Sequence, residues 1–272
     1  MTAPNQLSWH RGGSGEPLVL LHGGAGTWRL WEPIIPLLEA HHDVLALTLA
    51  GHWGGASLPA SGSAGIDALV DQAERDMEAQ GFDTAHLAGG SLGAWVALEL
   101  ARRGRARSVV GIAPAGGWRR GSVDWLLLEW MYRAFRVGAR LLARRPYAVA
   151  GRPRLRRLLL WHHFARPERM HPDYCAHMIT GVARCSGLDD FIAWSRQNGG
   201  ARDLERIRSP VLLAFPEHDR VLPRRRYGER IVDAIEHAEA VNLPGVGHVA
   251  MSDDPALVAR TIIGFTSRHR AR

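Results

Sequence analysis

A serine set between two glycines constrains this chain more than any other feature. Residues 87–90 form a short apolar run, Ser91 follows, and residues 92–98 have the apolar periodicity of a helix. A serine at a sharp strand-to-helix turn takes a positive φ, and side chains in place of Gly89 and Gly93 would collide with the chain around the bend. The pattern therefore predicts a turn that lifts the Ser91 hydroxyl above a sheet edge. Similar turns occur in sheets without a catalytic serine, so the turn alone does not establish a catalytic role for Ser91, and the rest of the sequence has to be considered.

Strand-like and helix-like segments alternate along most of the chain. Apolar runs typical of buried parallel strands occupy residues 18–21, 44–49, 109–113 and 211–215, and shorter strands are predicted over 6–11 and 238–243. Helices are predicted over 27–38, 66–80, 224–237 and 255–267. Such alternation indicates an α/β protein with a doubly wound, mostly parallel sheet covered by helices on both faces.

The alternation lapses in the middle of the chain. The segment there is helical and rich in arginine, with breaks near Pro146, Pro153 and Pro172. We therefore predict one core domain made of residues 1–116 and 209–272, with residues 117–208 inserted as a helical cap. A chain of 272 residues is long enough for one such domain.

Composition and charge exclude several classes of partner. The net charge is +7 and all 34 basic residues are arginines, but they are scattered without the aromatic–basic motif of a nucleic-acid binder.

No run approaches the roughly 18 apolar residues of a membrane span, and the first residues lack a signal-peptide run, so we expect a cytoplasmic protein. Cys175 and Cys185 are expected to be buried thiols, because they have neither a disulfide nor a metal-ligand pattern. No metal, cofactor or particular oligomeric state is predicted.

Polar residues follow several of the predicted strands, at the edge of the sheet where active groups gather. His22 and two glycines follow residues 18–21. Ser91 follows the strand expected over residues 87–90, and we call its turn into the next helix the elbow. Asp219 follows residues 211–215, and His248 follows residues 238–243. A nucleophile, a carboxylate and an imidazole thus occur in the chain order Ser, Asp, His. That order and placement resemble the α/β-hydrolase fold family, and the resemblance covers the chain from about residue 18 to residue 266.

The resemblance implies a role for each of these residues. Ser91 would attack an acyl carbonyl, His248 would take its proton and return it to the leaving group, and Asp219 would orient the imidazole. The oxyanion hole of the family corresponds to the backbone N–H groups of Leu92 and Gly24. A carboxylic ester of an apolar or aromatic small molecule is the expected substrate, with thioesters and lactones as variants.

Each assignment has a competitor. Glu217 is the rival acid, although the pattern and the distance from the strand favour Asp219. His22 and His52 are expected to be structural loop residues. The aromatic and sulfur side chains expected near the substrate could instead pack the cap onto the core; they are Trp28, Trp53, Trp95, Trp125 and Met131.

The residue at the elbow narrows the reaction type. Haloalkane dehalogenases and epoxide hydrolases of this fold carry an aspartate there, so Ser91 disfavours both chemistries, even though the cap offers Tyr132, Tyr147 and Tyr174. Open alternatives are a cofactor-free lyase or a carbon–carbon bond hydrolase that uses the same three residues, and a receptor with low turnover. The cap arginines are expected to form a solvated face or ion pairs, with Glu129, Glu168 and Asp173 among the partners, rather than to bind a membrane.

Overall fold

A seven-stranded sheet forms the centre of the computed structural model, which describes residues 8–58 and 65–270. The strand order is β1-β3-β2-β4-β5-β6-β7, and within the described residues β1 is the one strand antiparallel to its neighbour. The strands are β1 (Trp9–Gly13), β2 (Glu16–Leu21), β3 (His42–Leu47), β4 (Ala85–Gly90), β5 (Ala106–Ile112), β6 (Val211–Pro216) and β7 (Glu239–Leu243). The predicted mostly parallel α/β sheet is confirmed. The predicted strand over 6–11 lies partly outside the described residues.

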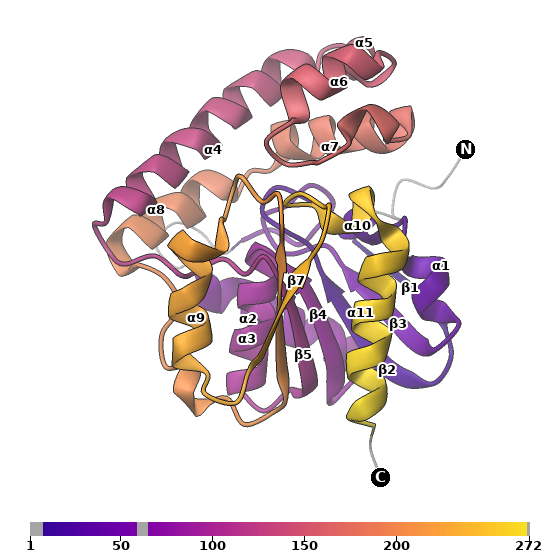
Figure 1. Ribbon diagram of the computed structural model, residues 1–272, viewed down its shortest axis with the longest axis vertical. Helices are drawn as coiled ribbons and strands as arrows, with labels where there is room; N and C mark the ends of the chain where they lie inside the picture. The colour runs from indigo at the N-terminus through magenta and orange to yellow at the C-terminus, as the bar shows by residue number, and fades with distance from the viewer. Residues whose placement is uncertain (1–7, 59–64, 271–272) are drawn as a thin grey trace.

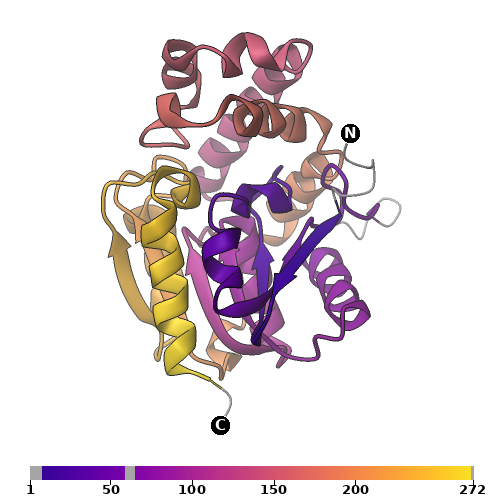
Figure 2. The same cartoon turned by 90° about the vertical axis from the view of Figure 1, so that its right-hand side faces the viewer.

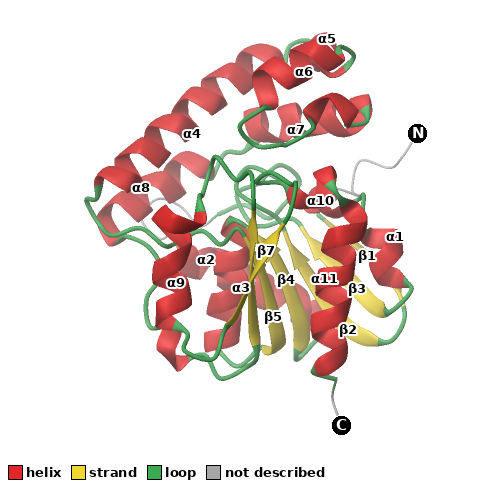
Figure 3. Ribbon diagram, viewed as in Figure 1, coloured by secondary structure: helices red, strands yellow, loops and turns green. Residues whose placement is uncertain are grey.

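Helices cover both faces of the sheet (Figures 1 and 3). Consecutive strand residues point to opposite faces, so Leu18 and Leu20 pack into one core cluster and Val19 and Leu21 into the other. One face carries α2 (Ile66–Ala79), α3 (Leu92–Arg102) and α9 (Glu229–Ala234), and the other carries α1 (Ile35–Glu39) and α11 (Pro255–Arg268). The short helix α10 (Ala250–Asp253) precedes α11.

Two predicted helices are interrupted. Residues 27–38 divide into a 3-10 turn, η1 (Trp28–Trp31), and α1, because Pro33 and Pro36 cannot donate backbone hydrogen bonds. Thr27 caps η1 as expected, since its side chain accepts from the Arg29 N–H. The helix predicted over 224–237 begins as a π-helical turn, η4 (Arg224–Gly228), and ends with α9 at Ala234.

A helical insertion lies between β5 and β6 and covers the carboxyl ends of the strands (Figures 1 and 2). It consists of α4 (Val123–Leu142), α5 (Pro146–Ala150), α6 (Pro153–Leu160), α7 (Pro172–Arg184) and α8 (Leu188–Asn198), with the 3-10 turns η2 (Pro167–Arg169) before α7 and η3 (Leu204–Arg206) after α8. The prolines that indicated breaks open α5, α6 and α7, because the first helical position needs no N–H donor. No helix in the described part of the chain is long and apolar enough to cross a membrane.

The arginines of the insertion use backbone as well as carboxylate acceptors. Glu129 is buried and pairs with Arg133 and Arg196, as the sequence suggested. The Arg156 guanidinium instead donates to main-chain carbonyls, among them that of Glu168. Asp173 accepts from the Tyr147 hydroxyl at 2.9 Å. Part of the positive charge therefore holds loops of the insertion together.

Candidate active site

Ser91 occupies the strained turn that the sequence predicts. Its φ is 54°, in the region that side chains rarely adopt. Its N–H donates to the Ile112 carbonyl at 2.9 Å, and its own carbonyl accepts from the N–H groups of Ala94 and Ala115 at 3.1 Å. The end of β5 and the first turn of α3 thus hold the backbone of Ser91 in place, and this tertiary support offsets the local strain.

The two glycines around the serine are required by close backbone contacts. A Cβ on Gly93 would lie 2.0 Å from the Leu21 carbonyl oxygen, and a Cβ on Gly89 would lie 2.3 Å from that of Gly93. Because both obstacles are main-chain atoms, no side-chain rotation relieves them. The elbow therefore depends on glycine at both positions.

We expect Gly93→Ala to destabilise the protein by at least about 3 kcal/mol, because β2 and α3 must separate to admit the methyl group. Urea denaturation followed by circular dichroism measures the change. Gly90→Ala is the control, since its Cβ would meet the end of the Met251 side chain at 3.3 Å, which can move. Equal stability of the Gly93→Ala variant and the unmodified protein would contradict the assigned elbow geometry.

Asp219 and His248 meet at the carboxyl ends of β6 and β7. The Nδ1 atom of His248 lies 2.8 Å from Oδ2 of Asp219, and both residues are 8% exposed. The other carboxylate oxygen of Asp219 accepts the N–H groups of Val221 and Leu222, each at 2.8 Å. Burial alone would raise the pKa of Asp219, but His248 and the two N–H donors outweigh it and lower that pKa. Asp219 therefore stays a carboxylate.

Glu217, the alternative to Asp219 as the acidic partner of His248, contacts a different group. Its carboxylate accepts the Gly245 N–H at 2.8 Å on an exposed loop. The structure therefore brings Asp219, and not Glu217, to the imidazole of His248.

A single carboxylate joins the His248 loop to the insertion. Oδ2 of Asp253 accepts the N–H groups of Gly247 and Ala165, both at 2.8 Å, and Oδ1 accepts that of Arg166 at 2.9 Å. The His163 carbonyl also accepts the Val249 N–H at 3.0 Å. These contacts fix the backbone on both sides of His248 against the loop between α6 and α7.

The loop after β2 is held by His22. One ring nitrogen, Nδ1, bonds to the Gly23 carbonyl at 2.7 Å, and the other accepts the Leu49 N–H at 2.9 Å. Burial, with a further contribution from His52, lowers the pKa of His22 well below its usual value, so the ring is neutral. His22 thus has the structural role expected of it. A Cβ on Gly23 would lie 3.3 Å from that of Ser91, which shows how closely this loop approaches the serine.

Ser91 and His248 line one cavity, which we call the His248 cavity. Gly23 and Gly24 border the same space, and so do apolar side chains such as Leu30 and Val182. Gly24 and Leu92 also border a second cavity at Ser91, beside Trp118 and Trp125. The N–H of Leu92 belongs to the first turn of α3, where helix geometry offers no intrahelical acceptor.

Tyr132 is a site residue that the sequence reasoning did not assign. It lines both cavities, and a Cβ on Gly24 would lie 4.0 Å from its hydroxyl oxygen. Burial raises the pKa of Tyr132 to about 12, against a smaller opposing effect of its hydrogen bond with Ser91, so the phenol is protonated. Tyr147 donates to Asp173 and Tyr174 to the Leu30 carbonyl, so neither hydroxyl serves the site in the same way.

The spacing of the buried residues along α4 could have identified Tyr132 as a site residue. Along α4, Trp125 and Leu128 are buried at one end and Ala139 at the other. Tyr132 falls on this stripe, four residues after Leu128, and the stripe faces the core. A phenol in the middle of such a stripe points under the insertion.

Of the five residues predicted to contact the substrate, two border cavities and three pack against other side chains. Trp125 borders the second cavity at Ser91, and Met131 lines a further cavity inside the insertion. Trp28 stacks on His10, Trp53 packs against His177, and Trp95 lies in the core.

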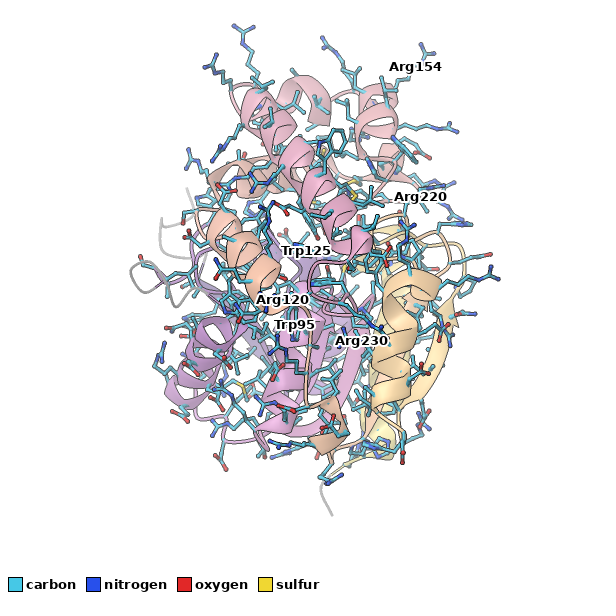
Figure 4. The ribbon with its side chains drawn as sticks, turned by 90° about the vertical axis from the view of Figure 1, so that its left-hand side faces the viewer. Trp95, Arg120, Trp125, Arg154, Arg220 and Arg230 are labelled. Atoms are coloured by element: carbon cyan, nitrogen blue, oxygen red, sulfur yellow. The ribbon has the colours of Figure 1, made fainter. Side chains whose placement is uncertain are left out.

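The position of Trp95 corrects the expectation of a substrate contact. Its indole N–H donates to Glu99 one turn further along α3, and its ring packs edge-on against Trp118 and Phe191. In Figure 4 it lies below Trp125, towards the sheet. Trp95 is 1% exposed and is absent from the described lining of both cavities at Ser91.

Metal ligation has no obvious place in the residues that the structure describes. No group of three or more histidine, cysteine or acidic side chains is arranged there to hold an ion. Cys175 and Cys185 are buried and free, as expected.

The sequence model of one family matches residues 18–261, and its description is "Alpha/beta hydrolase family". The chain belongs to the alpha/beta hydrolase family. The match begins within β2, so β1 lies outside it, and it covers strands β3 to β7, the elbow, the insertion and both loops that carry Asp219 and His248.

Known relatives of this alpha/beta hydrolase carry several hydrolase names. Epoxide hydrolase EphH of Mycobacterium tuberculosis is 36% identical over 207 residues, which cover 72% of this chain and 92% of the relative. A putative carbamate hydrolase, RutD of Azorhizobium caulinodans, is 27% identical and covers 93% of this chain and 92% of its own. Among solved structures, a thermophilic esterase from Thermogutta terrifontis has a TM-score of 0.74 at 20% identity, over 97% of this chain and 94% of its own. The sequence relatives support hydrolase activity for this chain, and the structural likeness shows the fold.

Proposed function

We propose that this protein is a serine hydrolase that cleaves a carboxylic ester of an apolar small molecule through an acyl-enzyme on Ser91. The observation that carries the proposal is the 2.8 Å hydrogen bond between His248 and Asp219 beside the cavity that His248 shares with Ser91. A serine hydroxyl is too weakly acidic to attack a carbonyl unaided at neutral pH. An imidazole oriented by a buried carboxylate supplies the missing base.

The proposed reaction has two halves. Ser91 Oγ attacks the ester carbonyl while His248 takes its proton, and the negative oxygen that forms is stabilised by the N–H groups of Gly24 and Leu92. The carbon–oxygen bond to the alcohol then breaks, and His248 gives its proton to the leaving oxygen. Water enters, loses a proton to the same imidazole and attacks the acyl-enzyme. The bond between the acyl carbon and Ser91 Oγ then breaks, and His248 returns the proton to Oγ. The products are a carboxylic acid and free Ser91.

The chemistry of Ser91 argues against epoxide opening by a covalent route. An epoxide opened by an aspartate gives an ester, which water can hydrolyse at its carbonyl carbon. An epoxide opened by Ser91 Oγ gives an ether, which has no carbonyl for water to attack. The enzyme would be alkylated after one turnover.

The lining of the site supports an apolar substrate. Apart from glycines, histidines and the hydroxyl side chains of Thr27, Ser91 and Tyr132, the described lining of the His248 cavity is apolar. It includes Leu30, Phe135 and Met178. No lysine occurs in the chain, and no arginine borders either cavity at Ser91. A substrate with a carboxylate or phosphate would therefore lack a cationic partner among the described residues of these cavities.

A fluorophosphonate probe and a stopped-flow assay test the proposal. We expect one phosphonyl group on Ser91 and, with p-nitrophenyl acetate, a burst of nitrophenol equal to the enzyme concentration when deacylation is the slower half. A lyase that uses the three residues for proton transfer alone would accumulate no acyl-enzyme and would give no such burst. Tight binding without turnover over a panel of esters would indicate a receptor instead.

A further inference from the structure

Two cavities meet at Ser91, and Tyr132 lies between them. The His248 cavity and the second cavity, here called the tryptophan cavity, share Gly24, Ser91 and Tyr132. An ester bound at Ser91 has two arms, the acyl group and the alcohol. Each cavity therefore has room for one arm.

The position of His248 decides which arm lies where. The alcohol oxygen must accept a proton from His248 when its bond to carbon breaks, so the alcohol lies on the side of that imidazole. His248 lines the His248 cavity, and it is absent from the described lining of the tryptophan cavity. The acyl arm is left with the tryptophan cavity.

A further cavity inside the insertion adjoins the His248 cavity. A third cavity, here called the insertion cavity, lies under α4, α6 and α7 and shares Phe135, His163, Met178 and Val182 with the His248 cavity. Its remaining lining is almost wholly apolar, and its outer end is bordered by Trp130 and Leu159, which are 74% and 39% exposed. We infer that the two cavities join at these four shared residues, which gives an apolar chain a route through the insertion towards the surface.

Unlike the insertion cavity, the tryptophan cavity ends among buried side chains. Most side chains around it are buried, among them Trp118, Trp125 and Leu222. The outer end of the insertion cavity, by contrast, is bordered by exposed side chains such as Trp130. The acyl side is therefore short and the alcohol side long.

We propose that the preferred substrates are esters of a compact apolar acid with a long, unbranched apolar alcohol, whose chain runs past His163 into the insertion cavity. This assignment rests on the proposed function and adds the substrate class. The imidazole of His163 stacks on Phe135 with ring centres 4.5 Å apart and meets His248 edge-on at 6.1 Å. Burial, with a further contribution from His248, lowers the pKa of His163 to about 3, so an uncharged ring borders the passage.

Two isomeric esters test the assignment in the unmodified protein. Octyl acetate and ethyl octanoate have the same formula and differ only in which arm is long. We expect kcat/KM for acetates to rise about fourfold for each methylene that the alcohol gains, which corresponds to about 0.8 kcal/mol, until the cavity is filled. Octyl acetate is therefore expected to exceed ethyl octanoate by at least about tenfold in a pH-stat assay.

A variant that fills the insertion cavity tests the route of the chain. Gly138 lines that cavity, and a Cβ there meets no atom within 4 Å, so Gly138→Phe projects a ring into open space. We expect kcat/KM for octyl acetate to fall at least about tenfold relative to that for ethyl acetate, because the two-carbon alcohol ends before the insertion cavity. Gly264→Phe is the matched control, since Gly264 is a helical glycine on α11 with equally open space around its Cβ.

The outcomes separate the two proposals. Equal rates for the two isomers, or a faster ethyl octanoate, would overturn the assignment of the arms while ester hydrolysis by Ser91 stands. A Gly138→Phe variant that slows ethyl octanoate rather than octyl acetate would place the acyl group in the insertion and overturn it as well. If neither isomer nor ethyl acetate is hydrolysed in a Ser91-dependent way, the proposed function itself fails.

Discussion

We expect Ser91→Ala to lower kcat/KM for ester hydrolysis by about three to six orders of magnitude while the protein remains folded. The variant loses the proposed nucleophile, but the N–H groups of Gly24 and Leu92, which we propose as oxyanion donors, stay in place, so we expect some residual rate. Folding should be unaffected, because the turn is held by backbone bonds from Ile112, Ala94 and Ala115 and not by the hydroxyl. Steady-state assays with p-nitrophenyl acetate and the melting temperature measure the two effects.

Ser186→Ala is the matched control for that experiment. The Ser186 hydroxyl donates to the Gly51 carbonyl at 3.3 Å, and the residue borders neither cavity at Ser91. Its loss should leave turnover unchanged. A folded Ser91→Ala variant that retains the full rate would remove Ser91 from the mechanism.

The sheet and the elbow could be predicted because both depend on short-range features of the chain. Apolar runs such as residues 18–21 can be buried only inside a covered sheet, and Gly89 and Gly93 leave few other geometries for the turn. The ends of helices were harder to predict. Residues 27–38 have a helical pattern of apolar side chains, but Pro33 and Pro36 divide them in the structure.

Side chains around the substrate depend on packing between distant segments, which local sequence does not reveal. Trp95 and Trp125 are 1% and 2% exposed and belong to the same core cluster, yet Trp125 borders the second cavity at Ser91 and Trp95 is absent from its described lining. Placing Tyr132 in the site requires the spacing of the buried residues along the whole of α4. The coupling of His248 to the insertion through Asp253 joins residues 88 positions apart at Ala165, which no pattern in one sequence indicates.

We expect Asp219→Asn to lower kcat by about four orders of magnitude, because it reverses the tautomer of His248. The amide oxygen takes over the N–H groups of Val221 and Leu222, so the amide nitrogen must face the imidazole and donate to its Nδ1 atom. The ring proton then sits on Nε2, which can no longer accept the proton of Ser91. The loss should lessen at high pH if hydroxide replaces the imidazole as base, and a pH profile of kcat measures this.

Glu217→Gln removes the same charge from the same loop and is the control. Glu217 accepts only a backbone N–H on the exposed side, so we expect a change of less than about threefold. If Glu217→Gln proved as damaging as Asp219→Asn, the loss of negative charge near the site, rather than the tautomer of one imidazole, would explain both. A large effect of Asp219→Asn alone would instead support the directed bond between Asp219 and His248, because Asp219 and not Glu217 contacts that imidazole.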